Sequence, residues 1–190
     1  FTSREAIRTS AFWLISLGHA VALLVVSAVN VHAITHVKEG LGYSLAQASL
    51  AFSLVTVGQF AGVMMGWVIG EKFDKRYVSA ACMLLHAAGL LMLTYAGSAI
   101  VLGIAVLVHG IGWGLRGPFM QAIRADYFGR SSIGMIIGLS SLITVFGNVG
   151  GPLVAGIFAD WTGDYRTGFT ILALIAALGS LFFIFAKPPK

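Results

Sequence analysis

Three side chains that could do chemistry interrupt one long apolar run of the sequence, residues 100–123. His109, Trp113 and Arg116 are separated by four and three residues, so on a helix they share one face. A guanidinium inside an apolar span costs about 2.5–3.5 kcal/mol on insertion scales, and such groups usually face water, a partner or a ligand. The spacing therefore predicts a polar site on one face of this segment, with Arg116 as its principal charge.

The composition indicates what kind of protein holds these residues. The chain has 190 residues, of which 58% are hydrophobic and 10% are charged. Soluble domains carry about 25% charged residues, so this chain cannot cover itself with a hydrated surface. We expect a polytopic membrane protein, and we attribute the net charge of +5 to cationic loops beside a membrane and not to a nucleic-acid partner. The single cysteine, Cys82, excludes an internal disulfide.

Six apolar runs are long enough to cross a bilayer as helices, which takes about 20 residues each. The predicted spans are residues 9–33, 46–70, 77–95, 100–123, 132–159 and 168–186. The predicted fold class is an all-α membrane protein, with residues 1–190 forming one six-helix transmembrane bundle. One set of loops and ends carries nine Lys and Arg residues, Arg124 among them, against only Lys38 and Arg166 in the other set. This bias predicts that both ends lie in the cytoplasm.

The chain opens at Phe1 with a charged segment, residues 2–8, that lacks a signal-peptide pattern. We interpret this segment as a loop, and we expect more protein upstream. His86, in the third span, has no polar neighbour three or four residues away and is interpreted as a packed or interhelically bonded histidine.

The loop between the second and third spans is densely charged. Five of its residues within six positions are ionic, namely Glu71, Lys72, Asp74, Lys75 and Arg76. Anchoring by positive charge explains only the basic residues, so the acidic ones favour a specific network of ion pairs with neighbouring helix ends. We expect this network to form a cytoplasmic gate, with Asp126 and Arg130, after the fourth span, as additional members.

Two spans carry regularly spaced small residues. Gly58, Gly62 and Gly66 lie four residues apart in the second span, a spacing that lets two helix backbones approach closely in lipid. We interpret this stripe as a packing seam, and Gly134 and Gly138 are expected to repeat the device in the fifth span. That span also contains a run of glycines around a proline, where the helix is expected to pack closely and bend: Gly147, Gly151, Pro152 and Gly156.

Together these patterns resemble the major facilitator superfamily. The charged loop is similar to its signature G-x-x-x-D-R/K-x-G-R/K-R/K, with Glu71 at the Asp position and Lys75 and Arg76 as the final basic pair, although Trp67 and Asp74 depart from it. Residues 147–156 are similar to the pattern g-x-x-x-G-P-x-x-G-G, with Ala155 in place of one Gly. Residues 109–130, with the opening Arg8-x-x-x-Phe-Trp, most resemble the monocarboxylate-porter branch.

The resemblance implies that the chain is the C-terminal half, built from two three-helix inverted repeats, of a twelve-helix secondary transporter. It implies alternating access for a small solute, with an organic anion such as a monocarboxylate as the first candidate, and neither a cofactor nor an enzymatic reaction. The implied partners are the bilayer, the solute, a proton and the N-terminal half, and the implied location is the cell membrane. The basic residue of the organic-anion antiporters is absent from the second and fifth spans, so their anion site cannot be transferred to this chain.

In this superfamily the first, second, fourth and fifth spans of such a half line the cavity, and these spans hold the polar residues. Besides His109, Trp113 and Arg116, the expected substrate-binding or coupling residues are His19, Asn30, Gln59, Thr144 and Asn148. The third and sixth spans, which are poor in polar residues, fall at peripheral positions.

Several alternatives stay open at this stage. Arg116 is a candidate for binding an anionic substrate, for pairing with an acidic group of the other half, or for bracing the cytoplasmic gate near Asp126. His109 is either a packed histidine or a proton-coupling group, since the unperturbed histidine pKa of about 6.5 suits proton exchange. Trp113 is either a packing residue or a stacking surface.

Three other functions also remain to be weighed. The first is a drug or metabolite efflux antiporter of the same superfamily, and the second is a six-helix channel or scaffold. The third is a membrane-embedded haem or metal enzyme, for which His32 and His36 have a ligand-like spacing but no acidic neighbour.

Overall fold

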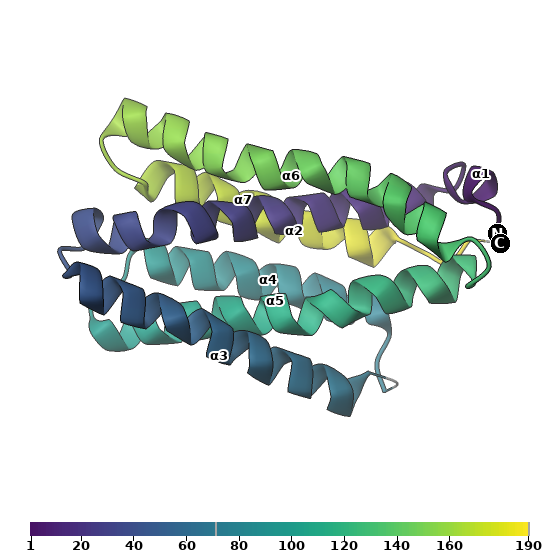
Figure 1. The fold of residues 1–190 in the computed structure, drawn as a ribbon, viewed down its shortest axis with the longest axis horizontal. Helices are drawn as coiled ribbons and strands as arrows, with labels where there is room; N and C mark the ends of the chain where they lie inside the picture. Colours follow the sequence, from purple (N-terminus) through teal and green to yellow (C-terminus); the bar gives the residue numbers. More distant parts are fainter. Residues whose placement is uncertain (71, 190) are drawn as a thin grey trace.

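The fold, seen in a computed structural model that describes residues 1–70 and 72–189, is a bundle of long helices (Figure 1). Glu71, predicted to belong to the charged loop, lies outside the described residues. The elements in chain order are α1 (Ser3–Ala6), α2 (Ser10–Thr35), a π-helical turn (His36–Gly40), α3 (Leu45–Ile69), α4 (Lys75–Thr94), α5 (Ala99–Phe128), α6 (Ile133–Thr162) and α7 (Arg166–Phe185). Six of them are long and apolar enough to cross a membrane, which confirms the predicted all-α, six-span fold class.

Two parts of the chain are more helical than their composition suggested. The segment at residues 2–8, interpreted as a loop, contains α1, because Thr2 and Glu5 form a capping box that satisfies the first amide groups of this helix. The span predicted to end at residue 123 continues as α5 to Phe128 and stops at Gly129, whose φ is +75°. Arg124 and Asp126 are therefore helical residues, even though the apolar run ends before them.

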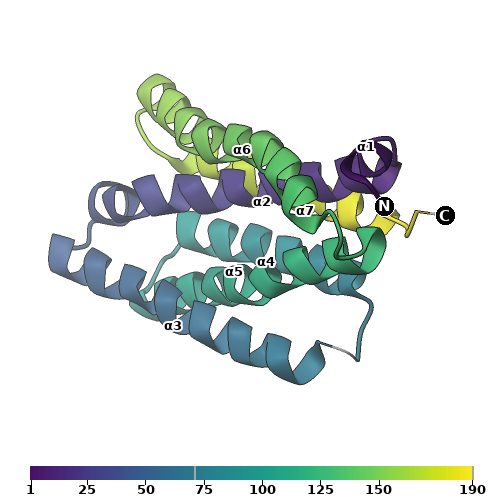
Figure 2. The same cartoon turned by 45° about the vertical axis from the view of Figure 1, so that its right-hand side comes forward.

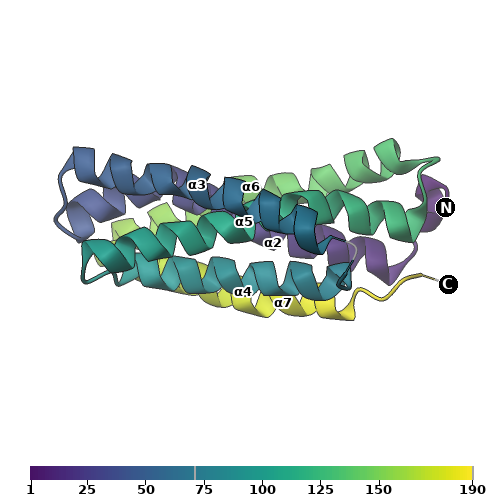
Figure 3. The same cartoon turned by 90° about the horizontal axis from the view of Figure 1, so that it is seen from below.

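The helices pair in a pattern that repeats between the two halves of the chain. α3 packs most extensively against α5, and α6 packs most extensively against α2, while α4 contacts both α5 and α7. Figures 1 and 2 show α3 and α6 at opposite edges of the bundle. In Figure 3 α3 and α6 lie toward one side, α4 and α7 lie toward the other, and α2 and α5 run between them. This arrangement matches two three-helix repeats, α2–α4 and α5–α7, and places both termini at one end of the bundle.

Close backbone contacts hold these helix pairs together. A Cβ atom at Gly62 would meet the carbonyl oxygen of Ile111 on α5, and one at Gly147 would meet the carbonyl oxygen of Ala20 on α2. Gly58 and Gly151 make the same kind of approach, whereas a Cβ at Gly66 would meet only side chains and one at Gly156 would lie 3.8 Å from the ring of His32. Gly134 and Gly138 have no described atom within 4 Å of a Cβ position, so, contrary to the prediction, they do not repeat the packing device within the described bundle.

The outward surface of the bundle is apolar, as a bilayer requires. Phe60 on α3 is 67% exposed and Phe146 on α6 is 78% exposed. Water would penalise such side chains, whereas lipid tails accommodate them. These two edge helices are also the least buried of the six spans, so they have the most surface to offer to lipid or to another protein segment.

Candidate functional site

Arg116 lies in the interior of the bundle. Its side chain is 1% exposed, and its Nε and Nη1 atoms have no hydrogen-bond partner among the described residues. It acts electrostatically on His19, His86 and His109, which come from α2, α4 and α5. The buried polar residues of the described chain include no aspartate or glutamate. The guanidinium is thus held in a low-dielectric environment without a counter-charge from these residues, which is an expensive arrangement.

His109 faces α4, where it meets a second histidine. Its Nδ1 atom lies 3.3 Å from Nδ1 of His86, and the two ring centroids are 4.7 Å apart. A neutral imidazole has one donor and one acceptor nitrogen, so one ring of this pair donates and the other accepts. The close approach depends on Gly89, because a Cβ there would stand 2.8 Å from the backbone nitrogen of His109. The pair therefore joins α4 to α5.

A second face of α5 is open. Trp113 is partly exposed, and Gly117 and Gln121, at successive steps of four residues, are exposed. A Cβ at Gly117 would have no atom of a described residue within 4 Å. Residues at such spacing share a helix face, so α5 presents its buried charge inward and an open polar position, Gln121, outward. The sequence prediction did not include Gln121, although its spacing of four residues from Gly117 indicates that the two residues share a helix face.

The other predicted site residues are spread over three helices. Asn30 on α2 and Asn148 on α6 are exposed, and Gln59 on α3 is partly exposed. Thr144 is buried and donates its hydroxyl to the carbonyl oxygen of Ser141, 3.0 Å away in the same helix. The side chains of Asn30, Gln59 and Asn148 form no hydrogen bond with a described residue.

Arg124 forms the most extensive polar contacts in the interior, and sequence reasoning assigned it only to the cationic loops. Its side chain is 3% exposed. Nη1 donates to the carbonyl oxygen of Met120 at 2.8 Å, and Nη2 lies 2.7 Å from Oγ of Ser140 and 3.2 Å from Nδ1 of His19. Ser16 extends the cluster by donating to Ser140 at 2.9 Å. The cluster joins α2, α5 and α6. Because Arg124 lies inside the bundle, the loops and ends on the side of the two termini carry eight Lys and Arg residues and not nine.

Charged residues at the end of the bundle near both termini surround a pocket of about 390 Å³. Lys72, Asp74, Lys75, Arg76 and Asp126 contribute to its lining. Lys75 Nζ lies 2.8 Å from Asp126 Oδ2, and Arg76 Nη2 lies 2.6 Å from Asp74 Oδ2. The hydrogen bond from Arg76 is the main cause that lowers the pKa of Asp74, which also caps α4. Arg130 is exposed and forms no ion pair with a described residue.

The ion pair between Lys75 and Asp126 connects the start of α4 to the end of α5. We expect Lys75→Glu and Asp126→Lys each to lower the melting temperature of the purified protein, and the double reversal to restore it at least in part. Exposed pairs couple by about 0.2–1 kcal/mol, and the side chain of Lys75 is 19% exposed. Lys72→Glu, at an exposed position of the same loop, is the matched control. Purely additive effects of the two reversals would contradict a direct pair.

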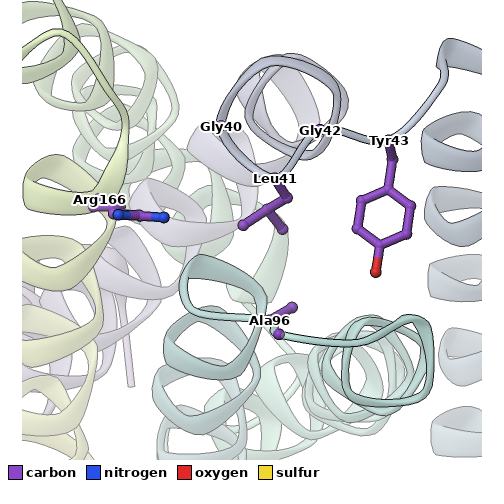
Figure 4. A pocket seen from close by; sticks show the side chains of 7 residues that line it. Gly40, Leu41, Gly42, Tyr43, Ala96 and Arg166 are labelled. Carbon is purple, nitrogen blue, oxygen red and sulfur yellow. The ribbon is translucent and has the colours of Figure 1, made fainter.

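At the opposite end of the bundle lies a second pocket, of about 350 Å³ (Figure 4). It is formed by Leu41, Tyr43 and neighbouring glycines after α2, by Ala96 after α4, and by Arg166 at the start of α7. None of the predicted substrate-binding residues contributes to its lining.

The two histidines with ligand-like spacing bind different carbonyl groups near this end. Nε2 of His32 lies 3.1 Å from the carbonyl oxygen of Pro152, and Nε2 of His36 lies 3.1 Å from that of Thr94. Within residues 1–70 and 72–189 no group of three or more His, Cys, Asp or Glu side chains could hold a metal ion. The side chains of His32 and His36 therefore make contacts between helices at this end of the bundle.

Comparison with solved structures places the fold. The fucose:proton symporter FucP of E. coli superimposes with a TM-score of 0.81 over 98% of this chain and 45% of the symporter, at 21% sequence identity. The proton:xylose symporter XylE superimposes with a TM-score of 0.72 over 97% of this chain and 45% of that chain, at 16% identity. At these identities the likeness is one of fold.

Curated relatives are similar over shorter stretches. The glucose-6-phosphate exchanger SLC37A2 of Homo sapiens is 30% identical over 134 residues, 65% of this chain and 26% of the exchanger. The bovine exchanger is 29% identical over 138 residues, 67% of this chain and 27% of its own length. The multidrug resistance protein MdtH of Aeromonas hydrophila is 27% identical over 125 residues, 66% of this chain and 32% of that protein.

The chain thus spans between a quarter and a third of the length of these relatives. A model of one family covers nearly all of it, from residue 15 to residue 190. The six membrane-crossing helices and their paired packing agree with that match. The chain belongs to the Major Facilitator Superfamily.

Proposed function

We propose that the chain is the C-terminal half of a secondary active transporter, not an enzyme, and that this transporter moves a small anionic solute by alternating access. The observation that carries the proposal is the pair of buried guanidinium groups, Arg116 and Arg124, in a described interior that has no buried carboxylate. Charged groups within membrane spans are costly and usually serve a substrate or a coupling ion. An anion would supply the missing counter-charge.

The two arginines differ in how they would serve an anion. Among the described residues, Arg124 is bonded only to uncharged acceptors, so no carboxylate of this part of the chain offsets its positive charge. Arg116 is sealed inside the bundle in this conformation, where it acts through its field, which is stronger in the interior than in water. Along the path of the solute, hydrogen bonds would come from the open positions Asn30, Gln59 and Gln121.

The chemical class that fits is a small molecule with a carboxylate or phosphate group. A monocarboxylate is suggested by the sequence resemblance, and a sugar phosphate is suggested by the names of the curated relatives. The main alternative is an efflux antiporter for drugs, which the similarity to MdtH supports. These alternatives differ in the charge of the solute. A cationic or neutral drug would gain nothing from two buried arginines.

The same proposal includes an orientation and a partner. Both ends of the chain would lie in the cytoplasm of a cell whose plasma or inner membrane holds the protein, because eight Lys and Arg residues flank that side of the membrane against two on the other. The solute would bind between this unit and a second six-helix half, as the coverage of 45% of each solved symporter supports. A proton or solute gradient would drive the cycle, and His109 is the candidate to exchange a proton.

Solute counterflow in proteoliposomes that contain the full-length protein tests the charge of the solute. The panel is lactate, glucose 6-phosphate, inorganic phosphate, glucose and tetraphenylphosphonium. We expect at least one of the three anions to exchange, with glucose and the lipophilic cation at background. Exchange of glucose or the cation, with all three anions at background, would overturn the proposal and favour a sugar carrier or the efflux alternative.

A further inference from the structure

The contact between Arg124 and His19 fixes the chemical state of the histidine. Nη2 of Arg124 lies 3.2 Å from Nδ1 of His19. A guanidinium has only donors, so Nδ1 must carry a lone pair to accept this bond. In a neutral imidazole whose Nδ1 is an acceptor, the proton is on Nε2. The geometry therefore defines the tautomer of His19.

The position of Arg124 makes this assignment firm. Nη2 also donates to Ser140, and Nη1 donates to the carbonyl oxygen of Met120, which holds the guanidinium plane from α5 and α6. Ser140 is itself held by Ser16, one turn from His19 on α2. The guanidinium cannot rotate away from His19 without breaking these bonds.

The charged groups around His19 are cations. The titratable groups that act on it are Arg116 and Arg124, both from α5 and both cationic. From the other helices packed on α2, α6 contributes Ser140 and α7 contributes Phe183 beside Gly18. No carboxylate among the described residues acts on the ring to stabilise an imidazolium.

The free nitrogen of His19 is available to a ligand. The residue is partly exposed, and Nε2 is bonded to no described residue and is not among the buried unpartnered nitrogens of the described chain. We infer that Arg124 is a positioning residue that presents His19 to the solute as an Nε2–H donor, and that His19 is not the proton carrier of the cycle. This inference rests on the proposed transport of an anion, because a donor next to two cations selects for an acceptor such as a carboxylate or phosphate oxygen.

The tautomer can be observed without any solute. In the full-length protein labelled with 15N-histidine, solid-state NMR separates protonated from unprotonated ring nitrogens, and loss of one signal set in His19→Gln assigns residue 19. We expect an unprotonated Nδ1 and a protonated Nε2, and a mixture of both tautomers in Arg124→Gln. A protonated Nδ1 in the unsubstituted protein would overturn the inference.

Two amide variants test the donor role by transport. Glutamine places its amide group near the position of Nε2, whereas asparagine places it near Nδ1. With inorganic phosphate, lactate or glucose 6-phosphate, whichever exchanges, we expect KM to rise about tenfold or more in His19→Asn, as for loss of one bond to a charged group. His19→Gln should stay within about threefold of the unsubstituted protein.

The outcomes separate this inference from the proposed function. Equal losses in both amide variants, or a greater loss in His19→Gln, would overturn the donor role even if anions are transported. If no anion exchanges at all, the proposed function fails and the solute-binding part of the inference fails with it. The NMR result would still decide whether Arg124 sets the tautomer.

Discussion

Arg116→Gln is expected to reduce anion exchange by the full-length protein more than tenfold, while the protein still reaches the membrane in normal amount. The substitution removes a buried charge that has no counter-ion among the described residues, so it relieves a desolvation cost and does not break an ion pair. Loss of transport without loss of protein would then reflect loss of the positive field on the solute. Counterflow together with quantitative detection of protein in membranes measures both quantities.

Two further variants give this experiment its controls. Arg116→Lys keeps the charge but not the planar fork of donors, so it should retain part of the activity if charge is the main contribution. Arg166→Gln removes an exposed arginine at the far end of the bundle and should leave transport unchanged. Full activity of Arg116→Gln would contradict the central role given to Arg116.

Gly147→Ala should lower the melting temperature of the protein by several degrees or prevent its accumulation in the membrane. The added methyl group would overlap the carbonyl oxygen of Ala20, so α6 and α2 would have to separate. Overpacking of this kind costs about 1–3 kcal/mol, and more where the obstacle is backbone. Thermal melting monitored by fluorescence-detected size exclusion gives the readout.

Gly138→Ala is the matched control on the same helix. A Cβ there would meet no described atom within 4 Å, and alanine has a higher helix propensity than glycine. We expect this variant to melt at the same temperature as the unsubstituted protein or slightly higher. Equal destabilisation by the two substitutions would show that the α2–α6 contact differs from the one described.

The six spans were predictable because the bilayer imposes one simple requirement, a run of about 20 apolar residues. The end of α5 was not, because Arg124 and Asp126 are polar yet continue the helix toward Gly129. A hydropathy window stops where polar residues begin, whereas a helix stops where its hydrogen bonds end. For this reason, the hydropathy of the sequence did not indicate the Arg124 cluster.

Helical spacing correctly put His109 and Arg116 on one side of α5, whereas Trp113, expected on the same face, is partly exposed toward Gly117. Spacing also does not indicate what a helix face meets. His109 and Arg116 lie on one side of α5, and their neighbours there, such as His86, come from other helices and distant parts of the sequence. Nothing in the local spacing tells a face directed at α4 from one directed at an open surface. Only the packing of α4 against α5 decides it.

The paired packing of the helices also limits how this unit can change shape. α3 is locked to α5, and α6 to α2, by glycine contacts with backbone atoms that leave no space for sliding. Between α2 and α5 the contact is slight, and the side chain of Arg124 bridges it. A conformational change that keeps these contacts would move each pair as a rigid arm, and the packing of α4 against α7, together with the bonds of Arg124 between α2 and α5, would resist the opening between the arms.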